Sequence, residues 1–476
     1  MDNIKNNEKL ASICYLFGSI FNAAIGFVLI PLLMSNMSVS GYGAFSVLQL
    51  CGTIFSAVCY FGITSAFTRS YFDHQKETEK MKCLSTAFIL VNIGGLSQVI
   101  IGIILSKSLS EFLFGSYDYY LLIIASLTSA SFVFINFFFL TYFRLANRPK
   151  SFLGLSVFSA ILNTTLTYVF LVVLDQGIHG VIYGGLISQC ITYVILFVSI
   201  FPRFKVFSFD FKQAKIMLSY GFQIVLSSAA GLSIIWSDQF FINHFLDLHE
   251  VGIYSLSVKL AGVILFIFIT PFFQVVNPIV LESLKHKNTK KLCQYYYDKY
   301  LYLGLASIIF TYYFAYVYFL FFKESEYVKA LDYLPWLLLS LFLHGSINIL
   351  SLGFSITRNM QPQSRVYMLM AFVNIILNSV LIPWLGVFGA VLSTILSYSI
   401  LSIILYKISN NLYDMRLSHY NLIPCGILLS MFLASVYLMK DTLEIICSSI
   451  FMILFIFRWI IVIKKRNNGL IEGENR

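Results

Sequence analysis

The most constraining feature of this sequence is a series of long apolar runs separated by short polar segments. Hydrophobic residues make up 58% of the 476 residues and charged residues only 11%. A water-soluble domain cannot bury that share of apolar side chains, and a helix needs about 20 apolar residues to cross the hydrocarbon core of a bilayer. The sequence therefore predicts an all-α polytopic membrane protein with about fourteen transmembrane helices.

The predicted spans lie near residues 10–34, 43–68, 83–106, 119–143, 151–174, 180–202, 216–245, 251–280, 298–322, 329–356, 366–385, 388–406, 419–439 and 443–463. The first run is too long for the core of a signal peptide and lacks a clear small-residue cleavage site, so we expect a retained helix.

The distribution of lysine and arginine predicts the orientation of these spans. If the N-terminus and every second loop face the cytoplasm, most of the 32 Lys and Arg residues fall on that side. The opposite loops then hold only Lys107, Lys323, Lys329 and Lys440. Cytoplasmic loops collect basic residues, so we expect both termini in the cytoplasm. Orientation alone explains the net charge of +10, which gives no indication of nucleic-acid binding.

The eight cysteines show no CxxC pair and no cluster with histidine. Such pairs and clusters are typical of metal sites and disulfide frameworks. We therefore expect the cysteines to fill the helix bundle, and we predict no metal and no cofactor.

Two pairs of stretches recur at one constant offset along the chain. GAFSVL at 43–48 resembles GIYSLS at 252–257, and GIHGVIYGGLIS at 177–188 resembles GVFGAVLSTILS at 386–397. Because six spans separate the copies, both halves enter the membrane from the same side. Such parallel repeats are typical of transporters in which two helix bundles move about a site at their interface.

This duplication predicts the domain organisation. We expect an N-terminal six-helix lobe at 1–202, a cytoplasmic linker at 203–215 and a C-terminal six-helix lobe at 216–408. Residues 409–476 then form two additional helices and a basic tail.

Several motifs resemble the multidrug/oligosaccharidyl-lipid/polysaccharide exporter superfamily. They are FGITSAFTRSYFD at 61–73, FRLANRPKS at 143–151 and SDQFFINHFLDLHEVGIYSLSVKLAG at 237–262. With fourteen rather than twelve helices, the chain is most similar to the O-antigen and polysaccharide flippases. The resemblance implies a V-shaped transporter with two lobes around a central cavity.

The same resemblance implies a substrate and a location. Such flippases carry an undecaprenyl-diphosphate-linked oligosaccharide from the cytoplasmic to the outer leaflet of the bacterial cytoplasmic membrane. Membrane lipids are expected partners, together with the polysaccharide polymerase and the chain-length machinery, and nucleic acid is not.

Polar side chains recur at helical spacing on the first two spans of each half. Residues three, four and seven apart share a helix face, and such stripes indicate a shared aqueous cavity. Interhelical hydrogen bonding is the alternative, because small and hydroxylated residues also hold membrane helices together. The candidate cavity-lining residues are Asn22, Gln49, Tyr60, Gln223, Ser227, Asp238, Lys259 and Asn277.

Asp238 and Lys259 are the charged members of this set. An ionised group near the bilayer centre is costly and is expected to face protein, water or a partner. Asp238 lies about eight residues before the short loop near His249 and Lys259 about the same distance after it, which places both at a depth of about 12 Å. We expect them to pair, either as a structural ion pair or in the cavity. If a diphosphate took Lys259 away, the proton affinity of Asp238 would rise, which would allow coupling to H⁺ or Na⁺.

Arg69 and Arg144 lie where the second and fourth spans meet the cytoplasm. Anchoring at the membrane surface is one interpretation of these residues. The second is entry of a diphosphate headgroup, because the guanidinium fork matches phosphate oxygens.

Two other functions fit the sequence less well than a flippase does. A cation-coupled multidrug exporter would be expected to carry a carboxylate inside the N-terminal half, yet spans 10–34, 43–68 and 83–106 contain no Asp or Glu. A membrane-bound polymerase or glycosyltransferase needs paired carboxylates or a long basic outer loop, whereas the outer loops here are short. We therefore expect a transporter and not an enzyme.

Overall fold

A computed structural model describes residues 2–438, except for 75, 204–207, 284–288, 322–325, 358, 416 and 419. Some side chains in the first helix and in the middle of α8 also lie outside the described part, among them those of Gln223 and Ser227. The predicted span 443–463 falls outside it as well.

Every secondary-structure element in the described residues is helical. Within this part of the chain, ten helices are long and apolar enough to cross a membrane, and the shorter apolar helices Ala24–Asn36 and Leu422–Tyr437 add to them. The prediction of an all-α, multi-pass membrane protein is confirmed at this level.

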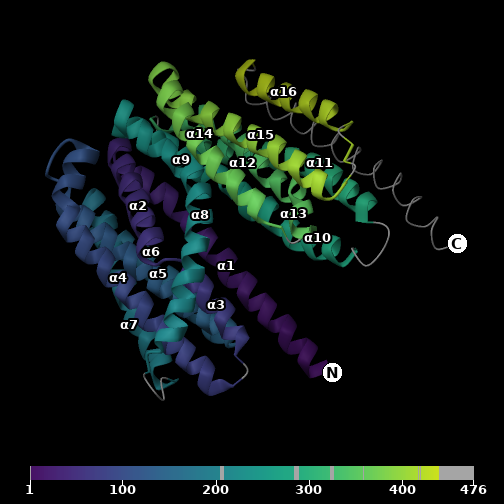
Figure 1. Ribbon diagram of the computed structural model, residues 1–476. Coiled ribbons are helices and arrows are strands. Elements are labelled where there is room, and N and C mark those ends of the chain that lie inside the picture. The colour runs from purple at the N-terminus through teal and green to yellow at the C-terminus, as the bar shows by residue number, and fades with distance from the viewer. Residues whose placement is uncertain are drawn as a thin grey trace. The chain divides into compact units, whose positions relative to one another are not determined.

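Packing divides the chain into two compact units, residues 1–252 and 253–476. The N-terminal unit contains α1 (Asp2–Asn36), α2 (Val39–Cys59), α3 (Ile63–Asp73), α4 (Glu77–Phe114), α5 (Tyr120–Leu145), α6 (Pro149–Tyr168), the π-helix η1 (Val169–Val173), α7 (Gly177–Ile200), the 3₁₀ turn η2 (Phe201–Arg203) and α8 (Phe211–Phe245). Figure 1 labels its α-helices. Helix α9 (Leu248–Ala261) begins in this unit and continues in the next.

In the N-terminal unit the second span is broken into α2 and α3. Phe61 and Gly62 adopt left-handed backbone angles, with φ of 43° and 60°. The broken segment meets α8 at a backbone contact, since a Cβ on Gly62 would lie 2.8 Å from the carbonyl oxygen of Gly221. Only glycine fits such a close approach. Consequently α8 packs in this unit against α2, α3 and α4.

Aromatic side chains form much of the core of the N-terminal unit. Phe67, Phe138 and Phe139 are fully buried between α3 and α5, and Phe67 lies 5.1 Å from Phe138 between ring centroids. Phe88 of α4 packs on Phe139 at 5.8 Å. Aromatic pairs add to the stabilisation that burial itself provides.

The C-terminal unit contains the rest of α9, η3 (Leu265–Ile269), α10 (Thr270–Ser283), α11 (Thr289–Phe321), η4 (Tyr327–Lys329), α12 (Ala330–Leu350), α13 (Leu352–Thr357), α14 (Gln361–Leu385), α15 (Val387–Leu412) and α16 (Leu422–Leu438). In Figure 1, α11, α12, α14 and α15 run alongside one another. Tyr300 of α11 stacks on Phe342 of α12 at 5.1 Å and donates a 2.6 Å hydrogen bond to its carbonyl oxygen.

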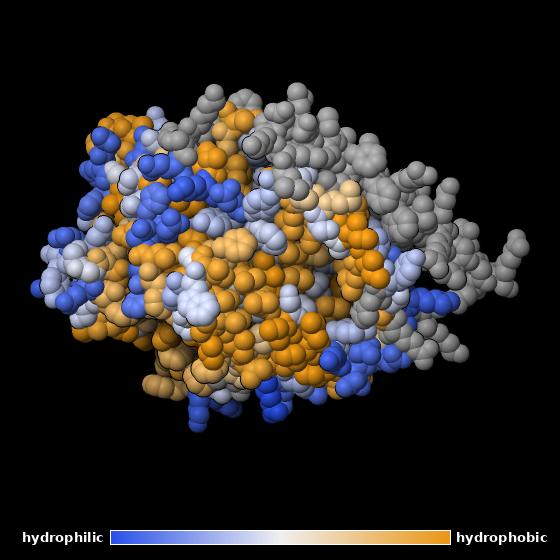
Figure 2. Space-filling view, turned by 90° about the horizontal axis from the view of Figure 1, so that it is seen from above, coloured by the Kyte–Doolittle hydropathy of each residue, from blue (hydrophilic) through white to orange (hydrophobic). Residues whose placement is uncertain are grey.

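Large apolar side chains are exposed along the helices of both units. Val28 is 64% exposed, Ile104 70% and Trp384 84%. Figure 2 shows hydrophobic side chains in broad continuous areas of the visible surface. A soluble monomer rarely exposes apolar patches of this extent, whereas lipid is the natural solvent for them.

Candidate functional site

One polar cluster in the N-terminal unit holds α2, α4 and α5 together. Gln98 of α4 is fully buried and donates hydrogen bonds from Nε2 to the carbonyl oxygens of Gly52, at 3.3 Å, and Leu127, at 3.1 Å. Its Oε1 accepts a hydrogen bond from Ser56 at 3.0 Å. Gln98 was not among the predicted site residues, although a lone glutamine in the apolar run 83–106 is a visible signal.

Tyr60 belongs to the same region and lies inside the unit. Its side chain is 4% exposed and its hydroxyl donates a 2.8 Å hydrogen bond to the carbonyl oxygen of Ser131 on α5. Tyr60 stands at the end of α2, where the helix breaks. In this structure it makes the interhelical contact that was the alternative to a cavity-lining role.

Asn136 and Asn163 are also held by interhelical hydrogen bonds. Asn136 Nδ2 donates to Gln189 Oε1 at 2.9 Å, and Asn163 Oδ1 accepts from Ser188 at 2.8 Å. Both asparagines therefore join neighbouring helices.

Asn22 combines a packing contact with exposure. Its Nδ2 donates to Ser156 Oγ of α6 at 2.6 Å and to the carbonyl oxygen of Gly18 at 2.7 Å, while the residue as a whole is exposed. Gln49 of α2 is exposed and Asn277 of α10 is half-buried. Their roles as lining residues stay predictions.

Asp238 of α8 is buried, with 1% of its surface exposed, and Lys259 of α9 is exposed. The first belongs to the N-terminal unit and the second to the C-terminal unit. Their pairing therefore stays a prediction. The side chains of Gln223 and Ser227 lie outside the described residues, so no position is assigned to them.

Arg69 lies beside a hollow at one end of the N-terminal unit. Its guanidinium stands 4.8 Å from the ring centroid of Tyr220 on α8. Hydrogen bonding to the Tyr220 hydroxyl raises the pKa of Arg69 above its ordinary value, so the group stays charged. Lys215, Ile216, Ser219 and Tyr220 line the hollow, whose volume is about 390 Å³. Lys215 thus lines the hollow, and Arg69 lies against Tyr220, another of the lining residues.

Arg144 lies at the C-terminal end of α5 and is exposed. Its carbonyl oxygen accepts a 3.4 Å hydrogen bond from the Tyr15 hydroxyl of α1. Connectivity places this residue at the same end of the unit as Arg69, because α3 and α5 both end there and α4, α6 and α8 begin there. We call this the basic end of the N-terminal unit.

The duplicated glycines lie at the opposite end, where α2 and α9 begin. A Cβ on Gly43 would collide with the carbonyl oxygen of Leu248, and a Cβ on Gly252 would collide with that of Val39. The contacts are reciprocal. Gly43 lies four residues after Val39, whose carbonyl oxygen Gly252 meets, and Gly252 lies four residues after Leu248, whose carbonyl oxygen Gly43 meets. The two helices can approach this closely only because neither glycine carries a side chain.

Comparisons with known proteins identify the sequence family. The sequence model of the family described as polysaccharide biosynthesis protein matches residues 11–284. No curated protein sequence matches the chain.

Solved structures resemble the fold over most of its length. The lipid II flippase MurJ in an inward closed conformation has a TM-score of 0.71 at 16% identity, covering 97% of this chain and 99% of that chain. An inward-facing multidrug resistance MATE family transporter of the MOP superfamily gives 0.65 at 16%, covering 84% and 95%. A MOP superfamily transporter from Pyrococcus furiosus gives 0.55 at 14%, covering 87% and 97%. At these identities the likeness concerns the fold.

Proposed function

Because the chain belongs to the polysaccharide biosynthesis protein family, we propose that it is a flippase for an undecaprenyl-diphosphate-linked oligosaccharide. The resemblance to the exporter superfamily is confirmed by this match and by the shared fold. The flippase moves its substrate from the cytoplasmic to the outer leaflet of the bacterial cytoplasmic membrane by alternating access. The unit carried is part of an O-antigen, a capsule or a related surface polysaccharide.

The proposal includes fourteen spans, two lobes related by a parallel repeat and cytoplasmic termini. The reciprocal contacts of Gly43 and Gly252 support the repeat, because copies of one motif occupy equivalent places in one interface. The gathering of Arg69, Arg144 and Lys215 at one end of the N-terminal unit supports the orientation, since basic residues collect on the cytoplasmic side.

The observation that carries the choice of substrate is the hollow at the basic end. Lys215 and Tyr220 line it, and the Tyr220 ring holds the Arg69 guanidinium in place beside these residues. A diphosphate headgroup enters from this side, and a guanidinium binds phosphate oxygens through two parallel hydrogen bonds. We assign the first contact of the headgroup to Arg69, with Lys215 as the second cation and Arg144 as a further entry residue.

Coupling to an ion gradient is a second part of the proposal. Asp238 is a carboxylate withdrawn from water, and in a membrane such a group marks an ion pathway or a structural pair. We propose that Asp238 binds H⁺ or Na⁺ when Lys259 turns to the substrate.

Reconstitution tests the function directly. Proteoliposomes are prepared with undecaprenyl-diphosphate oligosaccharide that ends in galactose, and galactose oxidase is added outside. An active flippase makes the whole lipid pool accessible to the enzyme, whereas protein-free vesicles expose only the outer leaflet. A glycolipid with the same sugars on a monophosphate is expected to move more slowly, because it offers fewer phosphate oxygens to Arg69.

Variants at the hollow connect this activity to the site. One charge-assisted hydrogen bond contributes about 1.5–3 kcal/mol, so Arg69→Gln is expected to lower the initial rate at low substrate by roughly ten- to hundredfold. Arg69→Lys keeps the charge and loses the fork, and should fall between wild type and Arg69→Gln. Lys82→Gln removes an exposed charge at the same end that is not among the residues lining the hollow, and it serves as the matched control. Equal rates for all three variants would remove the hollow from the pathway.

The alternative is a cation-coupled multidrug exporter, a function supported by the likeness of fold to multidrug transporters. Accumulation of an organic cation dye in the same vesicles under an imposed proton or sodium gradient, without movement of the glycolipid, would replace the flippase proposal with this one.

A further inference from the structure

A pocket of about 560 Å³ opens at the end of the N-terminal unit opposite the basic end. The last turns of α4 and α8 and the first turns of α2 and α9 form its walls. Its volume falls in the range of small-molecule sites, about 300–1,000 Å³. None of the sequence motifs assigned a role to this place.

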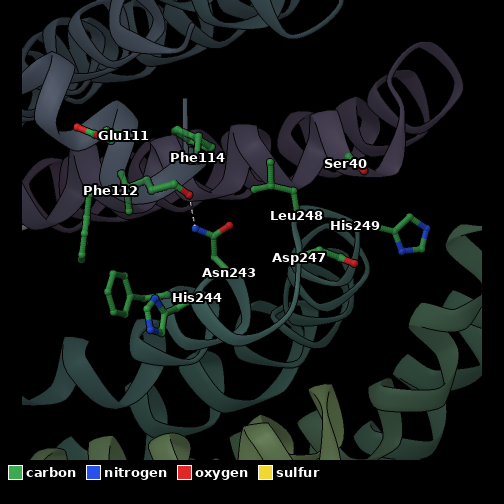
Figure 3. A pocket seen from close by; sticks show the side chains of 12 residues that line it. Ser40, Glu111, Phe112, Phe114, Asn243, His244, Asp247, Leu248 and His249 are labelled. Carbon is green, nitrogen blue, oxygen red and sulfur yellow. Dashed lines mark hydrogen bonds between the residues drawn. The ribbon is translucent and has the colours of Figure 1, made fainter. Parts of the chain in front are cut away.

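One side of the pocket is aromatic. Phe112 of α4 lies 5.8 Å from Phe240 of α8, and the Phe240 ring runs parallel to that of His244, with 2° between their planes at 6.4 Å. In Figure 3 Phe112 and His244 lie at the same side of the pocket. Phe112 is 63% exposed, so its ring is available to a ligand.

The other side of the pocket is polar. Asp247, His249 and Ser40 lie there, from the loop before α9 and the first turns of α9 and α2 (Figure 3). One carboxylate oxygen of Asp247 accepts a 2.8 Å hydrogen bond from the backbone N–H of Glu250, which fixes the position of the carboxylate. The Asp247 carboxylate only accepts hydrogen bonds, whereas His249 and Ser40 can each donate and accept.

Asn243 fixes the middle of the pocket. Its Nδ2 donates a 2.6 Å hydrogen bond to the carbonyl oxygen of Leu113, which joins α8 to α4. Figure 3 shows this bond and the amide oxygen turned away from it, toward the side of Leu248. This bond holds the ends of α4 and α8, which carry the aromatic residues, beside each other.

Charge narrows the choice of ligand. Glu111 and Asp247 both line the pocket, and among the described residues that line it there is no lysine or arginine. Such a pocket repels anions such as uronic acids and phosphates. The face of an aromatic ring carries partial negative charge, which attracts polarised C–H groups. A ring ligand with one apolar face and several hydroxyl donors satisfies both sides.

We propose that this pocket binds a neutral sugar residue of the glycan on the outer side of the membrane. This assignment rests on the proposed flippase function for its biological setting. The apolar face of the sugar ring stacks on Phe112 and His244, and its hydroxyls donate to Asp247 and to the amide oxygen of Asn243. The pocket holds the glycan after translocation, at the end of the unit where the product leaves.

Binding of soluble oligosaccharides to the purified full-length protein tests the assignment without any flipping. The probes are a neutral hexose trisaccharide and the matching trisaccharide with one uronic acid. Saturation-transfer difference NMR measures the binding of each probe. Saturable binding of the neutral probe is expected, with weaker binding of the acidic one. Phe112→Ala and His244→Ala should each raise the dissociation constant of the neutral probe about two- to tenfold, which is the range for the loss of one aromatic contact.

Phe211→Ala is the matched control, because Phe211 is 82% exposed at the opposite end of α8. Affinity unchanged in both pocket variants, or a preference for the acidic probe, would overturn the proposal. Displacement of the neutral probe by tetramethylammonium would also overturn it, in favour of a cation site. Sugar binding without any glycolipid movement would refute the flippase and leave the pocket assigned. Glycolipid movement without binding of the neutral probe would support the flippase and refute the assignment of the pocket.

Discussion

The contact between α2 and α9 gives the sharpest prediction about the packing of this protein. In Gly43→Ala the new methyl group would meet the carbonyl oxygen of Leu248, with the Leu248 carbonyl carbon at 2.9 Å and the Gly252 nitrogen at 3.0 Å. These are backbone atoms, which cannot turn aside as the end of a flexible side chain can. The two helices must therefore move apart at this point.

The size of the effect follows from two opposing contributions. Overpacking of a well-packed contact costs about 1–3 kcal/mol, whereas replacing glycine by alanine inside a helix stabilises it by about 1 kcal/mol. Gly154→Ala on α6 isolates the second contribution, because no heavy atom lies within 4 Å of a Cβ built there. We expect Gly43→Ala to be less stable than Gly154→Ala by about 1–3 kcal/mol.

The assay is heat-induced loss of the monomer peak in size-exclusion chromatography, in one detergent for all variants. Gly252→Ala should behave like Gly43→Ala, because its methyl group meets the carbonyl oxygen of Val39 in the same interface. The double variant should lose less than the sum of the single losses, since the first methyl group has already separated the helices. Equal midpoints for Gly43→Ala and Gly154→Ala, or a fully additive double variant, would refute the reasoning.

Three further predictions concern polar side chains. Gln98→Leu removes three buried hydrogen bonds of roughly 0.6 kcal/mol each and should lower stability by about 2 kcal/mol; a higher melting midpoint would contradict it. Tyr60→Phe should cost about 0.6 kcal/mol and leave transport unchanged, whereas lost transport at unchanged stability would restore its role as a lining residue. Asp238→Asn should abolish the stimulation of glycolipid movement by an imposed proton or sodium gradient, and an unaltered response would exclude coupling through this carboxylate.

Much of the architecture could be predicted from the chain alone. Runs of about 20 apolar residues become helices because hydrocarbon offers backbone amides no partner outside their own helix. The basic residues near the ends of these runs predicted which ends gather together, and Arg69, Arg144 and Lys215 lie at one end of the N-terminal unit. The repeated stretches GAFSVL and GIYSLS pointed to equivalent helices, and their first glycines meet reciprocally.

The faces of the helices were decided by tertiary structure. Tyr60 and Gln49 fall on one predicted stripe, yet Tyr60 is buried against α5 while Gln49 is exposed. Hydroxyl and amide groups in a membrane helix satisfy their hydrogen bonds equally well in a neighbouring helix or in water, so composition does not separate packing from lining. The break at Gly62 also changes the helical phase after Tyr60.

The pocket opposite the basic end and the contact that positions Arg69 both depend on segments far apart in the sequence. Arg69 and Tyr220 lie on α3 and α8, and Phe112 and His244 on α4 and α8. Apolar run lengths and charge counts are local properties, and they specified the spans and their direction. A binding site requires side chains from several helices at fixed distances. Only the packing of those helices determines these distances.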